Sequence, residues 1–179
     1  MRVVGGKYRG KKLVSPMDEN TRPTLDKTRE SIFNIIGMKI MDSTCLDLFA
    51  GSGAFGVEAL SRGASVVHFN DIHKNAIKVI NENIQSLKGL DREYAVFSKG
   101  YMEFLRDSNT KYDIVFLDPP YSMKVIGEIV SYMLDNKLVN EGGIFVIETL
   151  KEDVFDIDYK FVKVKEYVYG KTKVTVMWK

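Results

Sequence analysis

The chain has 179 residues, and 45% of them are apolar, which is enough for a single domain with a full hydrophobic core. We expect one domain over residues 1–179, in which residues 1–40 form a basic extension. No long apolar run and no charged-then-apolar leader occurs, so we expect no membrane span, no signal peptide and a cytoplasmic location. The single cysteine, Cys45, lies in an apolar run, which indicates a buried thiol and excludes an intrachain disulfide.

The net charge of +2 is unevenly distributed along the chain. Residues 1–30 carry eight basic and four acidic side chains, so the remainder is slightly acidic. Basic residues and one aromatic residue around glycines, as in MRVVGGKYRGKKL, are typical of an arm that contacts phosphates, but a solvated hairpin rim has the same composition. The candidate RNA-binding residues of this segment are Arg2, Lys7, Tyr8, Arg9, Lys11 and Lys12.

A helix is predicted after Pro23, with Thr24 as its N-cap and an apolar stripe of Ile32, Phe33 and Ile36 that ends at Gly37. The charged residues on or just before this helix are expected to be exposed to solvent: Arg22, Lys27, Arg29 and Glu30.

A glycine-rich turn follows the apolar run at residues 45–49, and a second helix is predicted from about residue 55 to 62. The spacing of Gly51, Gly53 and Gly56 satisfies G-x-G-x-x-G between a strand and a helix, which favours a nucleoside-binding loop. Asp71 ends the next predicted strand, 65–70, where a carboxylate can accept hydrogen bonds from a ribose. The candidate cofactor-binding residues are Asp47, Phe49, Gly51, Ser52, Gly53, Asp71, Ile72, Gly100 and Tyr101.

Asp47 distinguishes between nucleoside cofactors. A carboxylate just before the glycine turn would repel the pyrophosphate of NAD, whereas it can hold the amino group of a methionine moiety beside a sulfonium cation. The pattern therefore favours S-adenosylmethionine, although Asp47 can also cap backbone N–H groups of the loop.

The rest of the chain alternates between the two kinds of element. Helices are predicted at 73–87, 102–106 and around Ile126 to Leu134, and strands at 93–98 and 143–148. Two further strands, 161–168 and 172–178, are joined by Tyr169, Gly170 and Lys171 as a hairpin whose lysines can protect a sheet edge. This order predicts an α/β, Rossmann-like fold, with a mostly parallel seven-stranded sheet, helices on both faces and a small N-terminal hairpin plus helix. His68 and His73 lack acidic or cysteine partners at ligand spacing, so no metal site is expected.

The stretch YDIVFLDPPY is the most informative one. Residues 114–117 form an unbroken apolar run, typical of a strand buried on both faces, and Asp118 follows at its carboxyl end, where open α/β sheets bind ligands. The Asp118 carboxylate and the Pro119 carbonyl are two acceptors beside the Tyr121 ring, a set suited to an exocyclic amine on a stacked base. Alternatively, the prolines stop the strand and Asp118 caps a turn. The candidate catalytic residues are Asp118, Pro119, Pro120 and Tyr121.

Four segments taken together, MRVVGGKYRGKKL, TRPTLDKTRESIFNIIG, LDLFAGSGAFGVEALSRGA and FLDPPY, closely resemble the bacterial RsmD-type 16S rRNA guanine-N2 methyltransferases. The resemblance covers essentially the whole chain. It implies methyl transfer from S-adenosylmethionine to the exocyclic N2 of a guanine in 16S rRNA, free or within a 30S particle, by a monomer. It also implies that Arg22, Thr24 and Arg29 approach the active site from the N-terminal helix.

One segment departs from the family pattern. Where many such enzymes carry Asp or Asn to accept the adenine amino group, this chain has Ser98, Lys99 and Gly100, which leaves the adenine contact open. Three alternatives remain: a DNA adenine-N6 methyltransferase, a protein glutamine methyltransferase, and a non-catalytic RNA-binding assembly factor.

Overall fold

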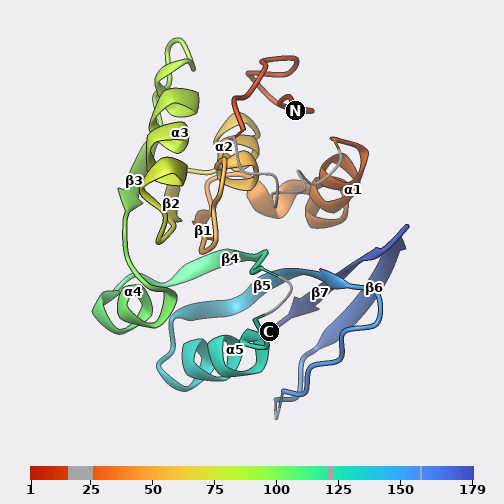
Figure 1. Ribbon diagram of the computed structural model, residues 1–179. Helices are drawn as coiled ribbons and strands as arrows, with labels where there is room; N and C mark the ends of the chain where they lie inside the picture. The colour runs from red at the N-terminus through yellow and green to blue at the C-terminus, as the bar shows by residue number, and fades with distance from the viewer. Residues whose placement is uncertain (16–25, 121–122, 158) are drawn as a thin grey trace.

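The computed structural model describes residues 1–15, 26–120, 123–157 and 159–179. A seven-stranded sheet in the order β3-β2-β1-β4-β5-β7-β6 forms its centre (Figure 1). Strands β1 to β5 run parallel, and β7 lies antiparallel between β5 and β6. This arrangement confirms the predicted mostly parallel sheet with a C-terminal hairpin. The strands are β1 (Thr44–Asp47), β2 (Val66–Asn70), β3 (Glu93–Phe97), β4 (Tyr112–Leu117), β5 (Val139–Leu150), β6 (Lys163–Tyr169) and β7 (Thr172–Trp178).

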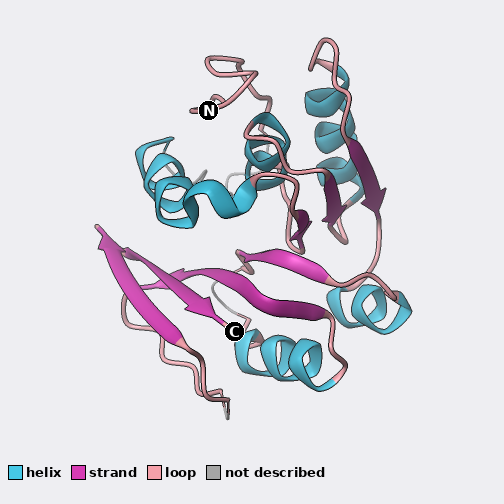
Figure 2. Ribbon diagram, turned by 180° about the vertical axis from the view of Figure 1, so that it is seen from behind, coloured by secondary structure: helices cyan, strands magenta, loops and turns pink. Residues whose placement is uncertain are grey.

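Helices cover both faces of the sheet, as the alternation predicted (Figure 2). The side chains of β4 divide between two cores: Ile114 and Phe116 face α1, α2 and α3, whereas Val115 and Leu117 face α4 and α5. This double burial explains why the strand is apolar without alternation. The helices are α1 (Asp26–Ile36), the short 3₁₀ turn η1 (Gly37–Ile40), α2 (Ala54–Ser61), α3 (Lys74–Gln85), α4 (Tyr101–Asp107) and α5 (Ile126–Asp135).

Two elements differ from prediction. Strand β5 begins at Val139 instead of residue 143, because Val139 pairs with Tyr112 ahead of an irregularity that Gly142 accommodates at φ +72°. The expected N-terminal hairpin is short: one antiparallel bridge joins Arg2 and Lys12, and Val3 N donates to the Lys11 carbonyl (2.9 Å).

The proposed N-cap, Thr24, lies outside the described residues. Among the described residues, no helix has the length and apolar character needed to span a membrane.

Candidate cofactor and substrate site

The glycine turn lies at the carboxyl ends of β1 and β2. Its backbone is fixed to β2, since Ala50 N donates to the Asn70 carbonyl oxygen (2.9 Å) and Gly51 N donates to Asp71 Oδ2 (2.9 Å). Gly51 adopts φ +54° and Gly53 φ +75°, a left-handed region that strains other L-residues. The turn can therefore present backbone close to a ligand.

Gly56 lets α2 pack directly against β2. A Cβ atom at this position would lie 2.1 Å from the Phe69 ring. Every residue of α2 is buried, so the helix and its N-terminal N–H groups have a fixed position beside the turn. The third glycine of the motif thus serves packing.

Asp47 is a buried carboxylate at the end of β1. Its Oδ2 accepts a hydrogen bond from Gly56 N (3.0 Å), which confirms that the side chain caps a backbone N–H. The pKa of Asp47 is raised to about 7. Burial is the largest cause and the Asp71 carboxylate adds to it, while the hydrogen bond from Gly56 acts in the opposite direction. A cation beside Asp47 would stabilise its charged form and so lower this raised pKa.

Asp71 ends β2 and holds two backbone groups. Besides Gly51 N, it accepts from His73 N at Oδ1 (2.9 Å). Each carboxylate oxygen retains acceptor capacity, so the side chain can still bind ribose hydroxyls. Its neighbour Ile72 is 64% exposed at the same edge.

Asn70 is a site residue that the sequence interpretation missed. Its Nδ2 donates to the Leu48 carbonyl (3.2 Å) and the Lys99 carbonyl (3.1 Å), which joins the ends of β1, β2 and β3. Its Oδ1 is buried and has no hydrogen-bond partner among the described residues. An Asn directly before Asp71 resembles an ordinary turn residue, so the sequence offers no signal for this role.

Asp118 lies on the same side of the sheet as Asp47. It continues the face of β4 that carries Phe116, whose ring stacks on Phe55 (5.1 Å between centroids) and contacts Phe33 (5.5 Å). Burial raises the pKa of Asp118 well above its ordinary value, and the carboxylates of Glu148 and Asp47 raise it further. The structure thus brings Asp118, Asp47 and the glycine turn together.

Glu148, the second residue that the sequence interpretation missed, is buried near the end of β5. The pairing of Leu117 with Ile147 places Asp118 and Glu148 next to each other on adjacent strands. Three carboxyl groups therefore converge on one side of this edge, and they favour a cationic ligand over an anionic one.

The other candidates surround this edge or lie beyond the described residues. Phe49 contacts the Tyr101 ring (5.7 Å between centroids), and Tyr101 OH donates to Glu128 Oε2 (3.2 Å). Gly100 precedes α4, Ser52 accepts a hydrogen bond at its carbonyl from Asn83 Nδ2 (2.9 Å), Pro119 is buried and Pro120 is exposed. Tyr121, Arg22 and Thr24 lie outside the described residues, so their positions stay predictions.

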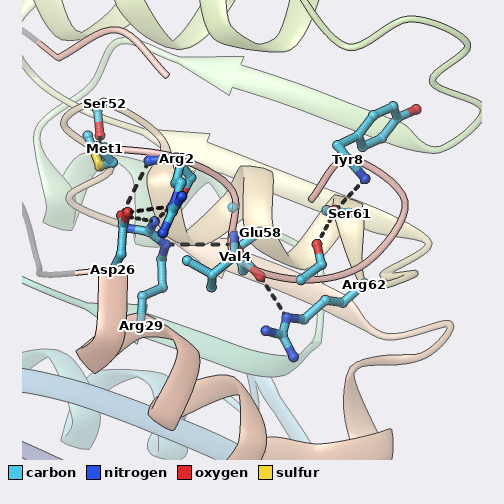
Figure 3. Close-up of polar contacts among 12 residues, drawn as sticks. Met1, Arg2, Val4, Tyr8, Asp26, Arg29, Ser52, Glu58, Ser61 and Arg62 are labelled. Atoms are coloured by element: carbon cyan, nitrogen blue, oxygen red, sulfur yellow. Dashed lines mark hydrogen bonds and ion pairs between the residues drawn. The ribbon is translucent and has the colours of Figure 1, made fainter. Parts of the chain in front are cut away.

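The expected solvent exposure of Arg29 is wrong. Its side chain is fully buried and forms ion pairs with Asp26 (2.9 Å) and Glu58 (3.8 Å), and its Nη2 also donates to the Arg2 carbonyl (Figure 3). Glu58 additionally accepts from Val4 N (2.8 Å) and from Arg62 Nε (2.7 Å). Arg29 therefore joins α1 and the N-terminal segment to α2, and it is not available to RNA in this arrangement.

The basic N-terminal segment packs on α2. Lys7 N donates to the Ser61 carbonyl (2.7 Å) and Tyr8 N to Ser61 Oγ (2.9 Å), as Figure 3 shows for Tyr8. The Tyr8 ring is half-buried, and within the described part of the chain its buried hydroxyl has no hydrogen-bond partner. The charged groups Arg2, Lys7, Arg9 and Lys12 are exposed, whereas Lys11 is half-buried. Arg2 pairs with Asp26 and Lys7 with Asp91, both at the surface.

Within the part of the chain that the structure describes, no three His, Cys, Asp or Glu side chains, the carboxyl groups beside the glycine turn included, are arranged so that they could hold a metal ion. His68 shares a hydrogen bond with Tyr112 OH (2.9 Å), and Cys45 is buried, as predicted.

The whole length of the chain resembles known proteins. The family model described as Conserved hypothetical protein 95 matches residues 1–178. The ribosomal RNA small subunit methyltransferase D of Haemophilus influenzae is 33% identical over 95% of this chain and 89% of its own length. The protein of the same name from Escherichia coli K12 is 35% identical over 86% of this chain and 76% of its own length.

Solved structures agree in fold. The Escherichia coli protein yhhF has a TM-score of 0.88 at 29% identity, covering 100% of this chain and 97% of that one. SMU.776, solved with SAH bound, has a TM-score of 0.69 at 16% identity, covering 89% of this chain and 50% of that one, a likeness of fold alone. The sheet is thus the Rossmann-like fold of class I methyltransferases, and the chain belongs to the Conserved hypothetical protein 95 family, in agreement with the RsmD-type resemblance of its sequence.

Proposed function

We propose that the protein transfers the methyl group of S-adenosylmethionine to the exocyclic N2 of a guanine in 16S rRNA. The observation that carries this proposal is the convergence of Asp118, Glu148 and Asp47 beside the glycine turn. A cationic methyl donor is compatible with such an anionic edge, whereas the pyrophosphate of a dinucleotide is not. The name and overall similarity of the curated relatives support an rRNA substrate.

The side chains and backbone around the glycine turn have the chemistry needed to bind S-adenosylmethionine. Asp71 would accept the ribose hydroxyls, the turn at Gly51 and Gly53 would pass beneath the nucleoside, and Asp47 would hold the amino group of the methionine part. The unpaired Oδ1 of Asn70 is one further acceptor near the ends of β1 and β3, where a conventional adenine contact is missing. When bound, the cofactor supplies an electrophilic methyl group on a sulfonium centre.

Asp118 would orient the target amine. Its carboxylate would accept one N–H and the Pro119 carbonyl the other, so that the nitrogen lone pair points toward the methyl group. The carboxyl cluster would stabilise the positive charge that develops on nitrogen. The raised pKa of Asp118 makes this carboxylate a better proton acceptor after transfer than an ordinary one. Turnover should therefore rise with pH as Asp118 loses its proton.

The direct test uses cofactor with a labelled methyl group. The protein is incubated separately with 30S particles, free 16S rRNA and duplex DNA, and the labelled nucleoside is identified after digestion. We expect N2-methylguanosine from RNA. Label on adenine N6 in DNA would support the DNA enzyme instead, and no label on any substrate would support a non-catalytic assembly factor.

A matched pair of variants tests the role of Asp118. Asp118→Ala should abolish turnover while the cofactor dissociation constant, measured by calorimetry, stays nearly unchanged. Asp135→Ala, at an exposed position at the end of α5, should leave both unchanged. A loss of cofactor binding in Asp118→Ala equal to its loss of turnover would contradict the assignment.

A further inference from the structure

Strand β6 divides its side chains by chemical type between the two faces of the sheet. Lys163, Lys165, Tyr167 and Tyr169 alternate with Val164, Glu166 and Val168. The pairing of Tyr167 with Val174, a core residue under α1–α3, assigns the lysines and tyrosines to the face on which Asp118 lies. Val164, Glu166 and Val168 lie on the opposite face, since Val164 pairs with Met177, which belongs to the core on the side of α4 and α5.

The rings of Tyr167 and Tyr169 are half-buried, because they pack against the core and also reach the surface. Lys165 and Lys171 are exposed, and neither has an acidic partner among the described residues. Edge lysines are explained by protection against strand pairing, but that role does not require aromatic rings on the same face. Exposed lysines interleaved with accessible aromatic rings are complementary to single-stranded nucleic acid.

The position of this face relative to Asp118 follows from the strand register. Glu148 pairs with Val174 and Val174 with Tyr167, so a row of residues crosses the sheet from the neighbourhood of Asp118 to Tyr167. With neighbouring strands about 4.8 Å apart, β6 lies roughly 14 Å from β4. The turn at Tyr169 and Lys171 lies at the carboxyl end of β5, the same edge of the sheet as Asp118 (Figure 1).

We propose that this face of β6, with Lys165, Tyr167 and Tyr169, together with Lys171 in the turn that follows the strand, is a second RNA-binding surface that holds single-stranded nucleotides flanking the target guanine. The tyrosine rings stack on bases and the lysines contact phosphates. The inference rests on the proposed function in one respect, since it takes RNA to be the substrate. It adds a contact on the opposite end of the sheet from the basic N-terminal segment.

The test measures RNA binding, cofactor binding and turnover separately. Tyr167→Ala combined with Tyr169→Ala should raise the dissociation constant of a fluorescein-labelled single-stranded RNA dodecamer by about 30-fold or more, the loss expected for two stacked bases at about 1–3 kcal/mol each. Tyr167→Phe combined with Tyr169→Phe should bind as the wild type does, because a phenyl ring also stacks. Val168→Ala, on the opposite face and 52% exposed, is the matched surface control.

Lys165→Ala combined with Lys171→Ala changes only exposed side chains and keeps both tyrosine rings, which pack against the core. This variant therefore tests the surface without disturbing the packing of the fold. If both lysines contact phosphates, the slope of log affinity against log salt should fall by about 1.4 for a single strand. Unchanged RNA affinity in the tyrosine-to-alanine variant, or an unchanged salt slope in the lysine variant, overturns the proposal.

A dimer in sedimentation that the tyrosine variant abolishes also overturns the proposal, because the face would then bind a second copy of the chain. The methylation assay distinguishes a failure of the β6 surface from a failure of the proposed reaction. Wild-type protein that methylates RNA while the β6 variants bind RNA normally refutes only the β6 surface. Wild-type protein that binds the dodecamer through β6 but methylates no RNA refutes only the proposed reaction.

Discussion

Replacing Asp47 by Asn should make the cofactor-free protein more stable and its cofactor binding weaker. Burial raises the pKa of Asp47 to about 7, so the folded state holds the Asp47 proton more tightly than the unfolded chain does. The stability of the wild type consequently falls as pH rises from about 4 to about 7, and this loss is complete above that range. Asn keeps an oxygen that can accept from Gly56 N but carries no charge.

The magnitude follows from the size of the pKa shift. At about 1.4 kcal/mol for each pH unit, the raised pKa of Asp47 lowers stability by roughly 4 kcal/mol at pH 8, as an upper limit, and by about 2 kcal/mol at pH 5, where the folded chain still holds the Asp47 proton and the unfolded chain does not. For a chain of this length, each kcal/mol corresponds to roughly 2–4 °C in melting temperature. The melting temperature of Asp47→Asn should therefore exceed that of the wild type by a margin that is larger at pH 8 than at pH 5.

Calorimetry and thermal unfolding at the two pH values test both halves of this reasoning. Cofactor affinity should fall about 10- to 100-fold in Asp47→Asn, because a hydrogen bond to a charged group contributes roughly 1.5–3 kcal/mol. An equal change in melting temperature at pH 5 and pH 8 would refute the electrostatic account of Asp47. Unchanged cofactor affinity would refute its place in the cofactor site.

Three further predictions concern packing and burial. Gly56→Ala should lower the free energy of unfolding by about 1–3 kcal/mol in urea titrations, because its methyl group would overlap the Phe69 ring; a neutral effect would contradict the close contact. Arg29→Met should destabilise by about 1.5–3 kcal/mol, because Glu58 loses one of its two cationic partners while Arg62 remains, and combining it with Glu58→Gln should recover part of the loss; full additivity of the two would argue against their coupling. Cys45 should resist thiol reagents in the native protein and react on unfolding, since burial raises its pKa to about 12; rapid native labelling would disagree.

The parts of the site that could be predicted from the sequence are those whose residues lie close together in the chain. An apolar strand followed by Asp118, and a glycine turn followed at a fixed interval by Asp71, both depend on contacts within short segments. The error at Arg29 has a different origin. Its partner Glu58 lies on another helix, and a charge pattern along α1 alone cannot distinguish a solvated arginine from one buried against a distant carboxylate.

Glu148 and Asn70 escaped prediction for a related reason. Each acquires its role only when the strand order is known, because β5 next to β4 places Glu148 beside Asp118, and β2 between β1 and β3 lets one amide reach both neighbours. Parallel neighbours in a doubly wound sheet are separated by whole helices in the chain, so their register is not visible in a linear sequence.

The side chain of Asn83 joins the N-terminal segment to the glycine turn. Its amide accepts from Val14 N (2.8 Å) and donates to the carbonyls of Val14 (3.0 Å) and Ser52 (2.9 Å), so one buried group clasps the end of the basic segment and the glycine turn at once. Any shift of the turn on cofactor binding must either pull residue 14 along or release one of these bonds. If the segment binds RNA and the turn binds the cofactor, as proposed, thermodynamic linkage makes the influence mutual: the factor by which bound cofactor changes RNA affinity is also the factor by which bound RNA changes cofactor affinity.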